Sequence, residues 1–198
     1  MPTAREAIQI LTEGNARFAA GQHLHPNLTK QIRLETHDQG QKPFAAILSC
    51  SDSRSPVELI FDQGIGDIFS VRNAGNTADE GVQGSLELGV HRFNVPLLVV
   101  LGHTDCGAIR NAIEDTPLGG AMAGLIERIK PVVEKVKRYK PELTGDELML
   151  EVTQANARHT AEILTNCSDI FQNRIASGEL TITTALYDLK RGLVEWLE

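Results

Sequence analysis

Cysteine is scarce in this sequence, with three in 198 residues, an odd number. So few cysteines exclude a disulfide-stapled scaffold and indicate a reducing compartment, where thiols stay free. Long apolar runs are also lacking: charges interrupt the N-terminal segment, and no later run approaches the ~20 residues of a membrane span. We therefore expect a cytoplasmic protein with no signal peptide and no membrane partner.

Positive charge is in short supply as well. The chain has 19 Lys and Arg residues against 26 Asp and Glu residues, which gives a formal net charge of −7 and a pI near 5.4. A nucleic-acid partner would require clustered positive charge, so none is expected. The hydrophobic content of 41% is typical of a folded globular protein, and the length fits a single domain spanning residues 1–198.

The first 40 residues are predicted to form an arm. Apolar side chains recur at helical spacing from residue 4 to about 20, which predicts a short amphipathic helix ended by Gly21. A polar stretch then separates this helix from the rest of the chain. A lone helix cannot bury its apolar face, so we expect the arm (1–40) to pack on the α/β core (41–198) or on a second subunit.

Downstream, short apolar runs alternate with helical patterns. Strands that alternate with helices are joined by right-handed crossovers into a parallel sheet. We therefore predict an α/β fold with a central, mostly parallel sheet flanked by helices. Ser55-Pro56-Val57-Glu58 predicts a capping box with proline at the first helical position. Strands are expected at 44–50, 67–72, 96–103, 180–187 and 194–197, with helices after 55, at 81–93, after 105 and over most of 119–176.

Two short segments contain the residues best suited to metal binding or catalysis. CSDSR at 50–54 follows the first predicted strand, and HTDCG at 103–107 begins on the last residue of the third. Ligands of open α/β sheets bind at this carboxyl edge. If the two strands are neighbours, Cys50, His103 and Cys106 converge, and two sulfurs with one imidazole suit Zn²⁺. Three protein ligands leave a fourth position open, which is the arrangement of catalytic zinc sites.

Asp52 and Arg54 leave the same turn beside the expected metal. Arg54 could be an ordinary surface arginine, but an Asp–Arg pair at this place would stay ionised and orient a metal-bound hydroxide. Asp52 is also a candidate for the fourth ligand.

Each cysteine taken alone is most simply a small buried hydrophobic residue. We favour a metal site because two motifs coincide, each at a strand end. Cys167 lies in a helical stretch without such neighbours, so we expect it to pack in the core. The segment at 64–67 (GIGD) precedes a strand and does not open a helix, which favours a turn over a phosphate-binding loop.

Three motifs together resemble those of the β-class carbonic anhydrases. They are CSDSR at 50–54, RNAGN at 72–76 and GHTDCGA at 102–108, in the family's order and at fitting separations. The close match covers about residues 41–110, whereas the arm and the helical tail agree only in their general pattern of apolar and polar residues.

The resemblance implies one zinc ion per chain, bound by Cys50, His103 and Cys106, with Asp52 and Arg54 as the catalytic pair. It implies an enzyme that reversibly hydrates CO₂ to bicarbonate and a proton through attack by zinc-bound hydroxide. Asp52 would bind zinc only in a closed form of the site.

The resemblance also implies a substrate pocket and a partner. The family lines its pocket with a glutamine, a phenylalanine and a glycine, which correspond here to Gln41, Phe69 and Gly107. Ile47 and Leu88 are further expected walls. Gln41 would reach the active site of a partner subunit, which implies a homodimer or a dimer of dimers with the N-terminal helix lying across the neighbour.

Some enzymes of this family hold bicarbonate at a second site built by a tryptophan, an arginine and a tyrosine. Arg72 and Tyr187 match the arginine and the tyrosine, but Ile47 replaces the tryptophan. This departure favours the open, water-ligated form. Leu88 replaces a tyrosine that is common in the helix after the second motif.

Two other functions remain open at this stage. The same zinc scaffold would also serve a carbonyl sulfide or carbon disulfide hydrolase, as in close relatives of the family. A non-catalytic zinc-binding or redox-sensing module would need a closed site or a resolving cysteine, and only Cys106 is available to Cys50.

Overall fold

Five strands form the central sheet: β1 (Ala45–Cys50), β2 (Ile68–Asn73), β3 (Leu97–His103), β4 (Thr181–Tyr187) and β5 (Val194–Leu197). The structure is a computed structural model that describes residues 1–197. The strand order is β2-β1-β3-β4-β5, with β1 to β4 parallel and β5 antiparallel to β4. The predicted mostly parallel sheet is therefore confirmed.

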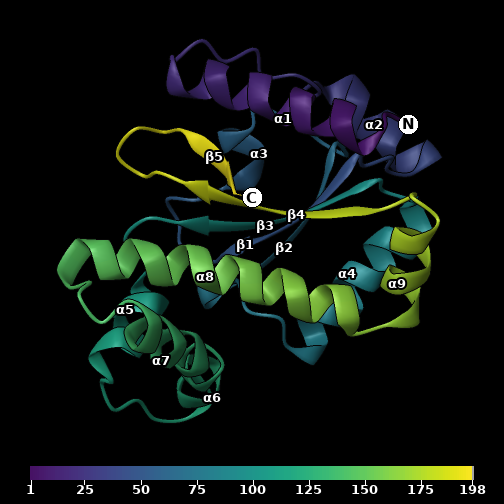
Figure 1. The fold of residues 1–198 in the computed structure, drawn as a ribbon. Helices are drawn as coiled ribbons and strands as arrows, with labels where there is room; N and C mark the ends of the chain where they lie inside the picture. The colour runs from purple at the N-terminus through teal and green to yellow at the C-terminus, as the bar shows by residue number, and fades with distance from the viewer. Residues whose placement is uncertain (198) are drawn as a thin grey trace.

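Helices cover both faces of this sheet (Figure 1). One face carries α1 and α3, with α2 beside them, while α4, α8 and α9 lie on the other and α5 to α7 extend beyond α8. The bounds are α1 (Ala4–Ala19), α2 (Lys30–Gln39), α3 (Val57–Ile60), the 3₁₀ turn η1 (Ala74–Asn76), α4 (Glu80–Phe93), α5 (Gly107–Glu114), α6 (Ala121–Glu127), α7 (Lys130–Tyr139), α8 (Gly145–Asn166) and α9 (Asp169–Ala176).

The central strands read as continuous apolar runs because both of their faces are covered. Every residue of β1 and of β3 is buried. Successive side chains alternate between faces, so Ile47 packs in the cluster with α1 and α3 while Leu48 packs in the cluster with α4 and α8. Two apolar layers thus pack the sheet between the helices.

The strand order reverses beside β1. The chain passes from β1 to β2 on one side and then crosses back to β3 on the other side. The carboxyl ends of β1 and β3 are therefore adjacent, as their parallel register from Ala46–Leu98 to Ser49–Leu101 confirms. Such a reversal is the usual place of a ligand site in an open α/β sheet.

Helix α1 packs on its own chain. Ala7 and Leu11 are fully buried in the core cluster beneath it. Asn15 is buried on the same face, where its amide donates to the carbonyl oxygens of Ile60 and Gly192. In the single chain, α1 therefore packs on the core of its own subunit. Helix α2, by contrast, has no buried residue.

Two local features differ from the sequence prediction. The capping box at Ser55 is wrong: the Ser55 hydroxyl donates to the carbonyl oxygens of Cys50 and Asp52, and Pro56 is the N-cap of a helix only four residues long. The hydroxyl of Ser55 thus binds the turn after β1, one residue before the N-cap position. The stretch expected to be merely polar contains α2, whose signals are the capping side chain of Thr29 and the terminal Gly40.

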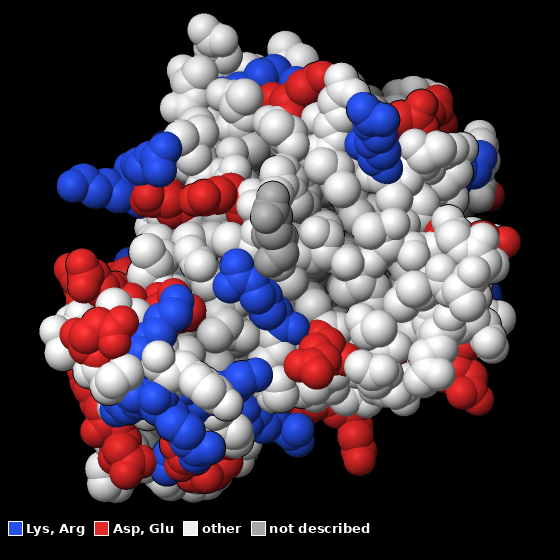
Figure 2. Space-filling view, viewed as in Figure 1, with Lys and Arg blue, Asp and Glu red and all other residues white. Residues whose placement is uncertain are grey.

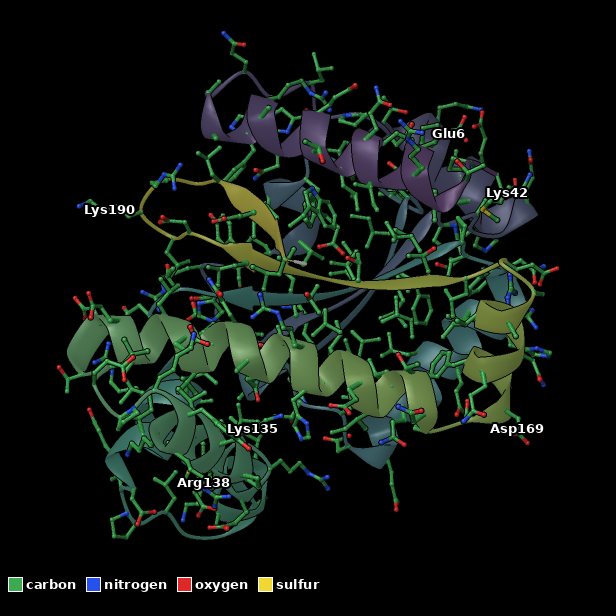
Figure 3. The ribbon with its side chains drawn as sticks, in the orientation of Figure 1. Glu6, Lys42, Lys135, Arg138, Asp169 and Lys190 are labelled. Atoms are coloured by element: carbon green, nitrogen blue, oxygen red, sulfur yellow. The ribbon has the colours of Figure 1, made fainter. Side chains whose placement is uncertain are left out.

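On the face shown in Figure 2, charged side chains of both signs gather mainly at the lower left, whereas the right-hand centre is largely uncharged. Lys135 and Arg138 project from α7 at the margin away from the sheet (Figure 3). Within residues 1–197, no helix is long and apolar enough to cross a bilayer.

Candidate metal centre

Cys50, His103 and Cys106 meet at the carboxyl ends of β1 and β3. Their ligand atoms all lie within 4.8 Å of one another, and all three residues are buried. The Sγ atoms of the two cysteines are 3.9 Å apart, and both thiols are free. Two sulfurs bound tetrahedrally to zinc at ~2.3 Å would lie roughly 3.8 Å apart. The observed separation fits that geometry.

His103 presents one ring nitrogen to the two sulfurs. Its Nδ1 lies 2.8 Å from the carbonyl oxygen of Thr104, which can only accept, so Nδ1 carries the proton. Nε2 is then the nitrogen with the free lone pair, and it is buried without a hydrogen-bond partner among the described residues. A buried, unpartnered imidazole nitrogen is what a metal ligand requires, and the Thr104 carbonyl fixes its orientation.

The two neighbouring thiols shift each other's pKa values in opposite directions. A hydrogen bond from Cys106 lowers the pKa of Cys50, and the backbone N–H groups of Gly75 and Asp52 add to this effect. The pKa of Cys106 is raised, because it donates that hydrogen bond and is buried beside the Cys50 thiolate. Burial alone would lower the pKa of His103, but the adjacent Cys50 sulfur raises it above its ordinary value. The shifts of Cys50 and Cys106 arise mainly from each other, and that of His103 from Cys50, as expected for three ionisable groups that meet at one buried point.

Gly75 brings a backbone donor to the metal centre. Its N–H lies 3.4 Å from the Sγ atom of Cys50, and its φ of 75° is in the left-handed region. A Cβ atom here would lie 2.8 Å from Cδ1 of Ile129 and 3.1 Å from the Cβ atom of Ala108. Glycine is therefore required on two counts, conformation and space.

Asp52 and Arg54 form a two-pronged ion pair beside the cysteines. Nε and Nη2 of Arg54 donate to the two carboxylate oxygens of Asp52 at 2.9 and 2.7 Å. These hydrogen bonds hold the pKa of Asp52 well below its usual range, against the opposing effect of burial. The carboxylate is therefore ionised and acts only as an acceptor. The group of three metal-ligand candidates does not include it.

Arg72 and Tyr187 lie on opposite sides of the two central strands. Arg72 on β2 donates from Nε to the carbonyl oxygen of Cys50 and from Nη2 to that of Asp52, at 3.0 and 2.6 Å. Tyr187 ends β4, pairs in register with His103 and is buried in the cluster that also contains Ile47. Arg72 thus braces the loop that carries Cys50 and Asp52.

The expected pocket residues are not all brought to this chain's own metal centre. Gly107 follows Cys106 directly at the start of α5. Phe69 packs against Gly89 and the ring of Phe93, several residues below the tip of β2. Gln41 is exposed beside Gly66.

The two further expected walls are also set apart from the cysteines. Leu88 is 54% exposed on α4, and Ile47 is fully buried on the face of the sheet beneath α1. The side chains that pack in one cluster with Cys50 and Cys106 instead include Ile109 and Ile129. Cys167 is half-buried and packs against the other core cluster.

Sequence reasoning missed Asp105 and Arg110. Asp105 lies between His103 and Cys106 with a φ of 56°, and it forms ion pairs with Arg54 and Arg110. These pairs lower its pKa, Arg110 having the larger effect. An Asp at this turn was visible in the sequence, but no local pattern links it to Arg54, which is 51 residues away.

Comparisons with known proteins agree with this geometry. The family model described as carbonic anhydrase matches residues 45–194. Carbonic anhydrase 2 of Mycobacterium tuberculosis is 41% identical over 190 residues, which covers 94% of this chain and 89% of the relative. The carbonic anhydrase of Mycolicibacterium smegmatis is 38% identical over 194 residues, covering 96% and 91%.

A solved structure supports the same assignment. A tetrameric β-carbonic anhydrase of Sordaria macrospora superposes with a TM-score of 0.78 at 25% identity, over 98% of this chain and 97% of that one. The family model, the curated relatives and the solved structure each match most of the chain, and the chain belongs to the β-carbonic anhydrase family.

Proposed function

We propose that this protein is a zinc-dependent carbonic anhydrase that reversibly hydrates CO₂ to bicarbonate and a proton. The observation that carries the proposal is the buried cluster of Cys50, His103 and Cys106 beside an ionised Asp52. Relatives that share about two fifths of their residues with this chain bear that name.

The three clustered residues would hold the metal. Two thiolates balance the charge of a divalent cation, and the neutral imidazole of His103 adds a third ligand through Nε2. Zinc in such a site supplies a Lewis acid that makes water acidic enough to ionise near neutral pH, for which carbonic anhydrase is the standard example.

Asp52 would orient the attacking oxygen. As an ionised carboxylate it accepts a hydrogen bond from that oxygen, which directs a lone pair at the carbon of CO₂. Arg54 keeps Asp52 ionised, and because Arg54 occupies both carboxylate oxygens it also holds Asp52 off the metal. This contact supports the open, water-ligated form of the site, as does Ile47 in place of the tryptophan.

The chain would act as a single domain that works in a homodimer or a dimer of dimers. Gln41 is exposed in the single chain, which supports the role in the site of a partner subunit that the family resemblance implies. Helix α2 buries no residue in the single chain and is the part of the arm that a partner would cover. Three free cysteines, two of them zinc ligands, favour a reducing, cytoplasmic location.

Stopped-flow CO₂ hydration on zinc-loaded protein tests the proposal. We expect about one zinc per chain and turnover far above background, and we expect Asp52→Asn to lower kcat by roughly 10²-fold with zinc retained. Background rates from metal-replete protein would reject the assignment. Sulfide release from carbonyl sulfide or carbon disulfide, without CO₂ hydration, would transfer the chemistry to those substrates.

A further inference from the structure

A second acidic residue contacts the catalytic arginine. Arg54 uses Nε and Nη2 to hold Asp52, which leaves Nη1 and the far side of Nη2 pointing away from that carboxylate. Both of these nitrogens contact Asp105: Nη1 lies 3.4 Å from its Oδ2, and Nη2 lies 3.3 Å from its backbone carbonyl oxygen. The planar guanidinium is therefore held at two ends, by a different loop at each.

Arg110 completes the arrangement from helix α5. Its Nη2 contacts the other carboxylate oxygen, Oδ1, of Asp105. Four charges of alternating sign thus run from Asp52 through Arg54 and Asp105 to Arg110, and they sum to zero. Within residues 1–197, Asp105 is the ion-pair partner recorded for Arg110. Without Arg110, the full charge of Asp105 would compete with Asp52 for Arg54.

The exposure of these ion-paired side chains argues that the pairs contribute little to the stability of the fold. The side chains of Arg54, Asp105 and Arg110 are 51%, 54% and 52% exposed. Ion pairs this exposed add little to folding stability, because water and salt screen them. An arginine this exposed would, however, move among many rotamers unless something restrained it.

The location favours a restraint on the catalytic pair. Asp105 stands between His103 and Cys106, so its backbone is fixed by two residues of the metal centre. Its left-handed φ of 56° turns its carbonyl oxygen toward Arg54. Asp105 thereby ties the loop that carries Cys50 and Asp52 to the loop that carries the other two ligands.

We propose that Asp105 is a positioning residue, held by Arg110, that restrains Arg54 and so keeps the Asp52 carboxylate aimed at the attacking oxygen. The inference rests on the proposed function, and it concerns a residue outside the group of three candidate metal ligands. A small displacement of an orienting group is enough to slow a reaction of this kind.

Asp105→Asn is the informative variant, because asparagine also tolerates a positive φ and the turn is preserved. We expect kcat to fall about threefold to tenfold with KM unchanged, because the orientation of the attacking oxygen is impaired and CO₂ binding is not. Zinc content and melting temperature should match those of the wild type. The Nε–H signal of Arg54 in ¹⁵N NMR should exchange faster with solvent, since the ion pair at Nη1 is lost and, of the two contacts, only the one from the backbone carbonyl oxygen to Nη2 is certain to remain.

Asp115→Asn is the matched control. Asp115 also has a positive φ, of 51°, and is paired with a cation, Lys130, at 2.7 Å, but it lies at the other end of α5. This variant should leave kcat and the Arg54 signal unchanged. Arg110→Gln should reproduce part of the Asp105→Asn defect, Arg110→Lys should restore activity, and the double variant should be no slower than Asp105→Asn alone.

Full activity with an unchanged Arg54 signal in Asp105→Asn would overturn the inference, as would a loss of zinc or of melting temperature that accounts for the slower rate. The two proposals fail separately. A wild-type protein without CO₂ hydration contradicts the proposed function, whereas an active wild type with an unaffected Asp105→Asn variant contradicts only the positioning role.

Discussion

The Sγ atoms of Cys50 and Cys106 lie 3.9 Å apart although 56 residues separate them in the sequence. The contact exists because β1 and β3 are adjacent parallel strands that end at the same edge of the sheet. Each thiol affects the ionisation of the other, lowering the pKa of Cys50 and raising that of Cys106. Binding of a metal ion by both sulfurs would release their protons.

Replacing one of these sulfurs should empty the metal centre. We expect Cys50→Ser to lower zinc content more than tenfold and to abolish CO₂ hydration, because a hydroxyl is a poor zinc ligand beside Cys106 and His103. Elemental analysis of purified protein measures the first effect. Cys167→Ser is the control and should retain about one zinc per chain, since Cys167 lies away from the site at the end of α8. Full zinc content in Cys50→Ser would contradict the assigned ligand set.

Removing zinc should destabilise the folded protein. A metal that binds the native state and not the unfolded chain raises stability with its concentration, so chelated protein should melt several degrees lower and recover on addition of zinc. Calorimetry with and without added zinc measures the shift. Cys50→Ser provides the comparison, because its melting temperature should respond to neither treatment. An identical melting temperature for zinc-loaded and chelated wild type would speak against the metal centre.

Adding a methyl group at Gly75 should disturb both fold and site. Gly75→Ala meets strain at φ 75°, a contact of 2.8 Å with Cδ1 of Ile129 that forces this side chain to shift, and a tight contact of 3.1 Å with Ala108. We expect a loss of about 2–3 kcal/mol and weaker zinc binding, because the N–H that faces Cys50 shifts. Gly178→Ala is the matched control: φ is also 75°, but no atom lies within 4 Å of the added carbon. Chemical denaturation should show a loss near 1 kcal/mol there. Equal losses at the two positions would refute the crowding argument.

A buried carboxylate that anchors the arm should make stability depend on pH. Asp62 has a side chain only 1% exposed, pairs with Arg17 at 2.6 Å and accepts from the backbone N–H groups of Leu24 and His25. Burial opposes its ionisation, but these contacts outweigh burial and hold the pKa of Asp62 below its ordinary value. Its contribution is therefore present above the unfolded pKa, ~3.9, and is lost as the pH falls through the lower folded value.

Asp62→Asn measures this contribution. We expect the variant to be about 2 kcal/mol less stable than wild type at pH 7, and the difference to shrink as the pH falls below ~4. Urea denaturation of both proteins at several pH values gives the difference, in which the shared contribution of zinc cancels. A difference that is independent of pH would show that the ionised form of Asp62 is not what holds the arm.

Much of the fold was readable because the relevant signals are local. The buried strands ending at Cys50 and His103 were visible as unbroken apolar runs, and α4 as an apolar face at helical spacing. The local pattern failed at Ser55, whose hydroxyl donates to the carbonyl oxygens of Cys50 and Asp52, while Pro56 is the N-cap of α3. Local patterns also failed at α2, whose residues are too polar to show a buried face.

For the site, residue types and their positions after strands were enough to predict a zinc centre with Asp52 and Arg54 beside it. The sequence by itself determined which side chains stand at the ends of the strands, where they can form the metal centre. This is because the positions at which strands end and helices begin depend on nearby residues. Only the tertiary structure decided that β1 and β3 are neighbours, that Gly75 donates to Cys50, and that Asp105 reaches Arg54. Those contacts depend on the strand order of the whole sheet, which long-range packing selects and which no local pattern encodes.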